Sequence, residues 1–251
     1  MYDSLEEKDL ERYKRHLMLA QVGEEGQLKI KNSRVLIIGA GGLGCPVALY
    51  LTAAGVGTLG IVDFDSVDVS NLQRQIIYTE QDIGKNKALA AKQRLQRLNS
   101  DVIINAITEK LEPQNIEDIV KEYDIVVDAT DNFTTRYLIS DTCIKLKKPE
   151  IYGAIFEFYG QVTVFGENGP CLRCLNPNPP KAGEMKSTKD IGVLGAIPGI
   201  IGSLQGAETL KCILKCGQSL KGRMIFVDAL TMKFDEIELP KNPKCTVCGG
   251  L

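Results

Sequence analysis

The chain has 251 residues, of which 44% are hydrophobic and 25% charged, a composition that excludes intrinsic disorder. Its formal net charge is −2, so bulk charge indicates neither a nucleic-acid nor a membrane partner. The acidic N-terminus is unlike a signal peptide. The longest apolar stretch, residues 191–204, is interrupted by glycine and proline and is shorter than the roughly 20 residues of a membrane span. We therefore expect a soluble, cytoplasmic protein.

Eight cysteines and a single histidine, His16, narrow the possible chemistry. In a chain without an export signal, cysteines are more often free thiols or metal ligands than disulfides. The single histidine argues against a histidine-rich zinc centre and against a catalytic triad built on histidine.

An amphipathic helix is predicted over residues 5–19, and alternating strand and helix patterns follow it. This alternation favours a mainly parallel sheet with right-handed crossovers. After Pro149 the pattern changes to hairpin strands, and residues at about 176–190 indicate a mobile loop rich in proline, lysine and glycine. In chain order we predict strands at 34–38, 59–63, 102–106, 125–128, 161–165, 224–228 and 234–239, and helices at 45–54, 86–98, 113–121 and 202–215.

The predicted fold class is α/β, a Rossmann-like doubly wound sheet that is mainly parallel and is extended by C-terminal antiparallel strands. No linker separates two independent domains, so we expect one domain over residues 1–251. Its three parts are a helical arm (1–33), a nucleotide-binding half (34–150) and a C-terminal half (151–251).

A glycine motif, Gly39-x-Gly41-x-x-Gly44, lies between a predicted strand and a predicted helix. Glycines let the backbone approach a phosphate or sugar, and the helix N-terminus offers unpaired N–H groups. Asp63 ends the next strand, where a carboxylate accepts hydrogen bonds from ribose hydroxyls. A tight turn without a ligand is the alternative, but the strand, helix and acid together favour nucleotide binding.

Two cations, Arg74 and Lys87, are expected at the same carboxyl edge of the sheet. They would neutralise the phosphates of ATP, and the chain contains no G-x-x-x-x-G-K-[ST] loop for that purpose. The alternative is that they are ordinary surface charges. Asp131 ends another buried strand there, either as a ligand of Mg²⁺ or as a helix N-cap.

Two C-x-x-C pairs, Cys171/Cys174 and Cys245/Cys248, can supply four thiolates to one tetrahedral zinc ion. Such a zinc clasp would pin the C-terminal tail, and four thiolates leave no open position, so the metal would be structural. A redox pair or disulfides are the competing interpretations.

These motifs together resemble the MoeB/ThiF/HesA group within the superfamily of ubiquitin-activating enzymes. The resemblance runs nearly end to end, and the block Asn71-Leu-Gln-Arg74-Gln75 is its most diagnostic part. It is carried by Arg12-Tyr13-x-Arg15, the glycine motif, Asp63-Phe-Asp65, Ser70 to Gln75, Gly84-x-x-Lys87, Asp128-x-Thr-Asp131-Asn132, Gly192-Val193, Gly202-Ser-Leu-Gln205 and both cysteine pairs.

The resemblance implies a single adenylation domain whose C-terminal half binds a carrier protein and zinc. ATP would lie over the glycine turn, and Arg15 would reach it from the second subunit of a homodimer. The substrate would be the Gly-Gly C-terminus of a small ubiquitin-like sulfur carrier, and a downstream sulfur donor would act later. The implied catalytic residues are Arg15, Arg74, Lys87 and Asp131, and the implied ATP-binding residues are Gly39, Gly41, Gly42, Asp63, Ser70, Asn71, Arg74, Lys87, Asp131 and Asn132.

One departure from the family pattern concerns the predicted mobile loop, where Thr188 stands at the place of a cysteine found in many relatives. We therefore expect the enzyme to stop at the acyl-adenylate. The sequence leaves open whether the carrier serves molybdopterin or thiamin synthesis. An NAD-dependent oxidoreductase and a non-catalytic protein that binds ubiquitin-like partners are the alternatives.

Overall fold

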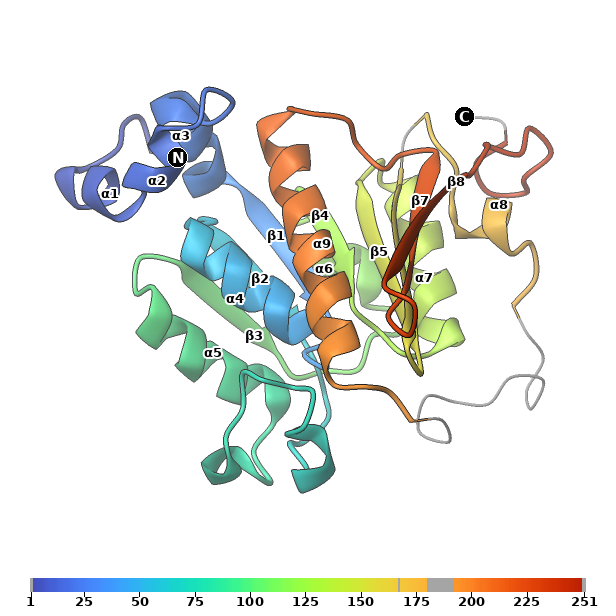
Figure 1. Cartoon of the computed structure of the whole chain (residues 1–251), viewed down its shortest axis with the longest axis horizontal. Coiled ribbons are helices and arrows are strands. Elements are labelled where there is room, and N and C mark those ends of the chain that lie inside the picture. The colour runs from blue at the N-terminus through green and yellow to red at the C-terminus, as the bar shows by residue number, and fades with distance from the viewer. Residues whose placement is uncertain (1, 167, 180–191, 250–251) are drawn as a thin grey trace.

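The computed structural model describes residues 2–166, 168–179 and 192–249. The described part contains one eight-stranded sheet with helices on both sides (Figure 1). Its helices are α1 (Glu7–Arg12), α2 (Lys14–Leu17), α3 (Gly23–Asn32), α4 (Gly44–Ala54), α5 (Lys87–Leu98), α6 (Ile116–Val120), α7 (Phe133–Lys145), α8 (Leu172–Leu175) and α9 (Ala196–Leu214). Its strands are β1 (Arg34–Ile38), β2 (Thr58–Val62), β3 (Ile103–Ile107), β4 (Ile125–Asp128), β5 (Glu150–Phe156), β6 (Tyr159–Phe165), β7 (Arg223–Asp228) and β8 (Lys233–Glu238).

The strand order is β3-β2-β1-β4-β5-β6-β7-β8. The first five strands in this order are parallel, and β6, β7 and β8 are antiparallel additions. The fold class expected from the sequence is therefore confirmed. The chain leaves β1 toward β2 on one side and returns to β4 on the other, and such a reversal opens a ligand crevice at the carboxyl ends of the strands.

Strand register brings the chemistry-bearing turns to that crevice. Ile38, the last residue of β1, is level with Val62 of β2 and with Asp128 of β4. The residues that follow these three strands, beginning with Gly39, Asp63 and Ala129, therefore emerge side by side.

The two faces of the sheet carry separate cores. Val35 and Ile37 of β1 point into a core shared with α4, α5 and α9, whereas Leu36 and Ile38 point into one shared with α6 and α7. Because both faces are covered, the central strands are apolar throughout rather than alternating, as expected for parallel strands.

The sequence predicts one helix over residues 5–19, and this is wrong in one respect. The structure has two short helices there, α1 and α2, separated by a break at Tyr13. Tyr13 turns inward, is 5% exposed, and receives a hydrogen bond from Asn99 Nδ2. The long helix α9 begins at Ala196, six residues before the predicted start at 202. Its Pro198 lies in the first turn, where proline is tolerated, and Gly202 allows close packing against Pro46.

Three further elements, α7, α8 and β5, are not predicted from the sequence, whereas α3 falls inside the predicted helical arm. Within the described residues, no helix is both long and apolar enough to cross a membrane.

Candidate functional site

The glycine turn between β1 and α4 is shaped by close backbone approaches. Gly39 has φ +97°, and a Cβ atom there would lie 2.6 Å from the carbonyl oxygen of Ala129 at the end of β4. A Cβ atom at Gly44 would overlap the carbonyl oxygen of Gly39. Only glycine fits both positions, so the turn passes tightly over the sheet and begins α4 with its N–H groups directed at the crevice.

Asp63 braces this turn from the end of β2. Its Oδ2 accepts a hydrogen bond of 2.8 Å from the N–H of Ala40, and its Oδ1 accepts one of 2.9 Å from the N–H of Asp65. Burial raises the pKa of Asp63, and the nearby ammonium of Lys87 lowers it in part. Each carboxylate oxygen retains a lone pair for a further donor, as a ribose hydroxyl would require.

The two predicted cations lie at the same turn. Lys87, the first residue of α5, is only 7% exposed, and its Nζ lies 3.4 Å from Oδ2 of Asp65. The Cγ of Arg74 would lie 3.7 Å from a Cβ atom at Gly42. Because Lys87 is buried and its ammonium lies beside a carboxylate, the interpretation of Lys87 as an ordinary surface charge is wrong.

The segment before Arg74 is held by local polar contacts. Arg74 donates a hydrogen bond of 2.9 Å to the carbonyl oxygen of Ser70. Asn71 accepts a hydrogen bond of 3.2 Å at Oδ1 from the N–H of Asp68, which caps the short 3-10 turn Val69–Asn71. Ser70, Asn71 and Arg74 therefore form one ordered unit beside the glycine turn.

Asp131 and Asn132 emerge beyond the end of β4. Asn132 is the N-cap of α7, and its Oδ1 accepts a hydrogen bond of 2.9 Å from the N–H of Thr135. The capping role considered for Asp131 thus belongs to its neighbour. Asp131 is exposed at the carboxyl edge of the sheet, where a carboxylate can reach a magnesium ion on bound phosphates.

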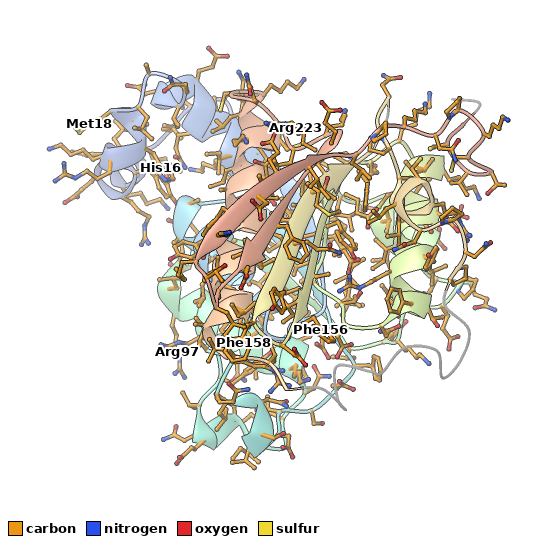
Figure 2. All side chains as sticks on the ribbon, turned by 45° about the vertical axis from the view of Figure 1, so that its right-hand side comes forward. His16, Met18, Arg97, Phe156, Phe158 and Arg223 are labelled. Carbon is orange, nitrogen blue, oxygen red and sulfur yellow. The ribbon has the colours of Figure 1, made fainter. Side chains whose placement is uncertain are left out.

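Arg15 lies away from the other predicted site residues. It is exposed on α2, between Tyr13 and His16, which are both anchored near the C-terminal end of α4. The glycine turn is at the other end of α4, which is about 16 Å long. Figure 2 shows His16 at the upper left, well apart from Phe156, which ends β5 at the lower end of the sheet in this view. Arg15 does not join its own chain's glycine turn.

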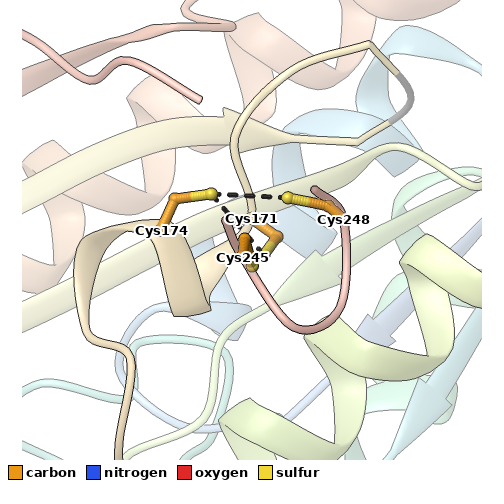
Figure 3. Close-up of side chains that lie close together, drawn as sticks. All are labelled: Cys171, Cys174, Cys245 and Cys248. Atoms are coloured by element: carbon orange, nitrogen blue, oxygen red, sulfur yellow. Dashed lines mark hydrogen bonds between the residues drawn. The ribbon is translucent and has the colours of Figure 1, made fainter. Parts of the chain in front are cut away.

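The four cysteines of the two C-x-x-C pairs come together between α8 and the C-terminal tail (Figure 3). All four sulfur atoms lie within 4.8 Å of one another, and two pairs of Sγ atoms are 3.5 Å and 3.4 Å apart. Around a tetrahedral zinc with bonds of about 2.3 Å, the sulfur atoms are roughly 3.8 Å apart. Burial disfavours ionisation of Cys245, yet backbone N–H groups of Cys248 and Val247 lower its pKa to about 7. The donor set and its geometry fit a structural zinc ion.

Comparison with known proteins identifies the family of the chain. The model of the ThiF family matches residues 13–247. The chain belongs to the ThiF family.

Among curated proteins, the chain is 48% identical over 248 residues to the sulfur carrier protein adenylyltransferase of Thermus thermophilus, a match that covers 96% of this chain and 92% of that protein. It is 44% identical to the SAMP-activating enzyme E1 of Haloferax volcanii, covering 98% and 91% of the two chains. Among solved structures, E. coli MccB has the same fold with a TM-score of 0.84 at 24% identity, covering 98% of this chain and 74% of that one.

The structure adds site residues of this ThiF-family chain that the sequence analysis did not single out. The hydroxyl of Tyr78 donates a hydrogen bond of 2.8 Å to the carbonyl oxygen of Ala40. Asn86 caps α5 and donates a hydrogen bond of 3.0 Å to the carbonyl oxygen of Asp63. The buried Arg136 donates to the carbonyl oxygen of Thr130 at 2.5 Å. The N-cap pattern at Asn86 could have been found from sequence, but the other two contacts depend on tertiary packing. Thr188 and most of the predicted mobile loop lie outside the described residues.

Proposed function

We propose that this chain is an ATP-dependent adenylyltransferase that activates the C-terminal carboxylate of a small ubiquitin-like sulfur-carrier protein. The observation that carries this proposal is a pair of cations, the buried Lys87 and the partly exposed Arg74, at the glycine turn in the crevice between β1 and β4. A triphosphate requires positive charge at that place, whereas nicotinamide dinucleotide requires far less. The relatives named adenylyltransferase and activating enzyme support the same reaction.

The reaction requires that the enzyme orient the carrier carboxylate against ATP and neutralise the charge of the phosphates. It does not require a covalent intermediate on the enzyme. A carboxylate oxygen of the carrier forms a bond to the α-phosphorus, the bond from that phosphorus to the bridging oxygen breaks, and pyrophosphate leaves. The product is the carrier acyl-adenylate. Negative charge grows on the phosphate oxygens as the leaving group departs, and fixed cations stabilise it. One histidine in the chain is compatible with this chemistry, because no side chain has to act as a nucleophile.

Each predicted residue has a place in this proposal. Asp63 binds the ribose hydroxyls, and Arg74 and Lys87 bind the β- and γ-phosphates. Asp131 holds Mg²⁺, which when bound offsets phosphate charge. The remaining polar and glycine positions line the nucleotide: Gly39, Gly41, Gly42, Ser70, Asn71 and Asn132.

The site also needs a second copy of the chain. Arg15 lies near the far end of α4 in its own chain, so it can contribute only across a homodimer. The four cysteines hold structural Zn²⁺ away from the crevice, which fixes the C-terminal tail to α8. The sulfur donor acts after the acyl-adenylate has formed.

The test is carrier-dependent ATP–pyrophosphate exchange with purified carriers that end in Gly-Gly. We expect exchange, and a mass gain of one adenylyl group on the carrier. Carriers of the molybdopterin and thiamin types are tested side by side, which identifies the pathway. The proposal would be refuted if the protein bound NAD tightly and catalysed no ATP–pyrophosphate exchange with any of the carriers.

A further inference from the structure

The helix that carries Arg15 is too small to hold its own position. Helix α2 has four residues and buries none of them, and a single turn is unstable in isolation. Its placement, and with it the direction of Arg15, must come from contacts made by the residues on either side. Two such contacts flank Arg15, one through Tyr13 and one through His16.

The contact through His16 is a chain of two hydrogen bonds. Nδ1 of His16 lies 2.9 Å from Oε1 of Gln27, and Nε2 of Gln27 donates to the carbonyl oxygen of Ala54 at 2.8 Å. Gln27 is completely buried. Since the amide nitrogen of Gln27 is committed to Ala54, its oxygen faces His16, and the hydrogen must sit on Nδ1 of the histidine. Both the neutral and the charged imidazole can donate from that nitrogen.

The contact through Tyr13 ends at the same place. Asn99 Nδ2 donates to the hydroxyl of Tyr13 at 2.9 Å and to the carbonyl oxygen of Thr52 at 3.0 Å. Thr52 and Ala54 both belong to the last turn of α4. The residues on both sides of Arg15 are thus tied to the helix whose other end forms the glycine turn.

We propose that His16, acting through Gln27, is a positioning residue that aims Arg15 into the active site of the partner copy. This inference rests on the proposed function, in which Arg15 completes the site across a homodimer. His16 does not touch the nucleotide; it sets the place from which Arg15 reaches out. If His16 loses its donor, Gln27 keeps a buried, unpaired oxygen and α2 loses the hydrogen bond that fixes it on the C-terminal side of Arg15, so the direction of Arg15 is less well fixed.

Two substitutions separate the hydrogen bond from the shape of the ring. His16→Phe keeps an aromatic ring beside Tyr13, with which His16 stacks at a centroid distance of 6.3 Å, but removes the donor. His16→Gln keeps a donor. We expect His16→Phe to lower kcat of pyrophosphate exchange roughly 10- to 100-fold, the effect of a displaced catalytic group, with little change in KM for ATP. His16→Gln retains most of the activity. Lys29→Ala, on the exposed side of α3, is the control.

Mixed dimers, made by co-expression with two affinity tags, test whether His16 acts across the interface. An Arg15→Ala copy paired with a Lys87→Met copy has one complete site and should recover about half of the wild-type activity, because the arm of one copy serves the other. His16→Phe paired with Lys87→Met should recover to the same degree. His16→Phe paired with Arg15→Ala should stay inactive, because neither arm is intact.

The outcomes distinguish the inference from the proposal beneath it. One pattern of activity would overturn the inference about His16 but not the proposed function. In it, the His16→Phe and Arg15→Ala pair recovers activity, whereas the His16→Phe and Lys87→Met pair does not. This pattern would mean that His16 acts on the site of its own chain. Full activity of His16→Phe would also overturn the inference about His16 alone. No recovery between Arg15→Ala and Lys87→Met would refute the shared site itself, and the role of His16 with it. Activities are compared only between mixed dimers whose unfolding temperatures are equal. A difference in activity then cannot come from loss of folding.

Discussion

Replacing Lys87 by methionine tests the buried cation at the centre of the proposed site. Methionine has a similar length, so the apolar stem of the side chain keeps its place while the ammonium disappears. Lys87 is 7% exposed, and its only ion pair among the described residues is to Asp65, whose side chain is half exposed. The ammonium therefore lies beside the carboxylates of Asp65 and Asp63, and in the proposed function it binds phosphate.

The expected loss follows from the environment of the ammonium. A unit charge about 4 Å from a phosphate oxygen gains about 4 kcal/mol in a medium of effective dielectric constant near 20. Part of this is offset by the water that each group loses. Removing one positioned donor from a developing anion costs about 2.7–4 kcal/mol, which is a 10²- to 10³-fold loss in rate. We expect Lys87→Met to lose that much kcat/KM in carrier-dependent pyrophosphate exchange.

Lys85→Met is the matched control. It lies two residues away, is half exposed, and pairs with Asp82 on the surface, so its loss should leave exchange unchanged. Thermal unfolding of Lys87→Met should stay close to that of the wild type, because the ion-pair partner that it leaves behind, Asp65, has a half-exposed side chain that water can solvate. An active Lys87→Met enzyme, or one that is inactive only because it is unfolded, would refute the argument.

Three further predictions concern the cysteine clasp, the glycine turn (with Gly199 of α9 as its comparison) and a buried acid. Metal analysis should find one zinc per chain, and Cys245→Ser should lower both the zinc content and the unfolding temperature, because the tail loses its link to α8; a stable, metal-free wild type would contradict this. Gly44→Ala should destabilise the fold by about 3 kcal/mol in urea, because the added Cβ atom overlaps a backbone carbonyl oxygen. Gly199→Ala, in a helix with open space around it, should instead stabilise by about 0.5–1 kcal/mol. Burial and the neighbouring Asp128 raise the pKa of Glu150 well above its ordinary value, and Arg136 offsets this only in part. The folded state then binds one proton more than the unfolded state above the usual glutamate pKa, so stability falls as pH rises, by at most about 1.4 kcal/mol per pH unit. Glu150→Gln should remove this slope and stabilise the protein at pH 8, as pH-dependent urea titrations would reveal; an unchanged slope would show that Glu150 titrates normally.

Local patterns were sufficient where one residue type satisfies one local requirement. The glycines at 39 and 44 were recognisable because only glycine permits those close approaches. The strands β1, β2 and β4 appear as continuous apolar runs because both of their faces are buried. The two cysteine pairs were recognisable because their spacing is that of a metal ligand pair, although 70 residues separate them.

Other features depended on contacts that no local pattern records. The break at Tyr13 arises because its hydroxyl meets Asn99, 86 residues away. The early start of α9 arises because its first turns are buried, with Ile197 and Ile201 at 1% and 0% exposed, and burial makes an otherwise poor helix sequence helical. The assignment of the cap to Asn132 instead of Asp131 was likewise settled only by the hydrogen bond to Thr135.

The amino-acid sequence by itself determined the fold class, the glycine turn, the candidate nucleotide residues and the candidate metal ligands, because each of these follows from spacing and residue chemistry along the chain. The tertiary structure alone decided that Lys87 is buried, that Arg15 lies at the far end of α4 from the turn, and that His16 is joined to Gln27. These facts are contacts between segments that lie far apart in the sequence. Such contacts depend on how whole helices pack against the sheet, and that packing exists only in the folded chain.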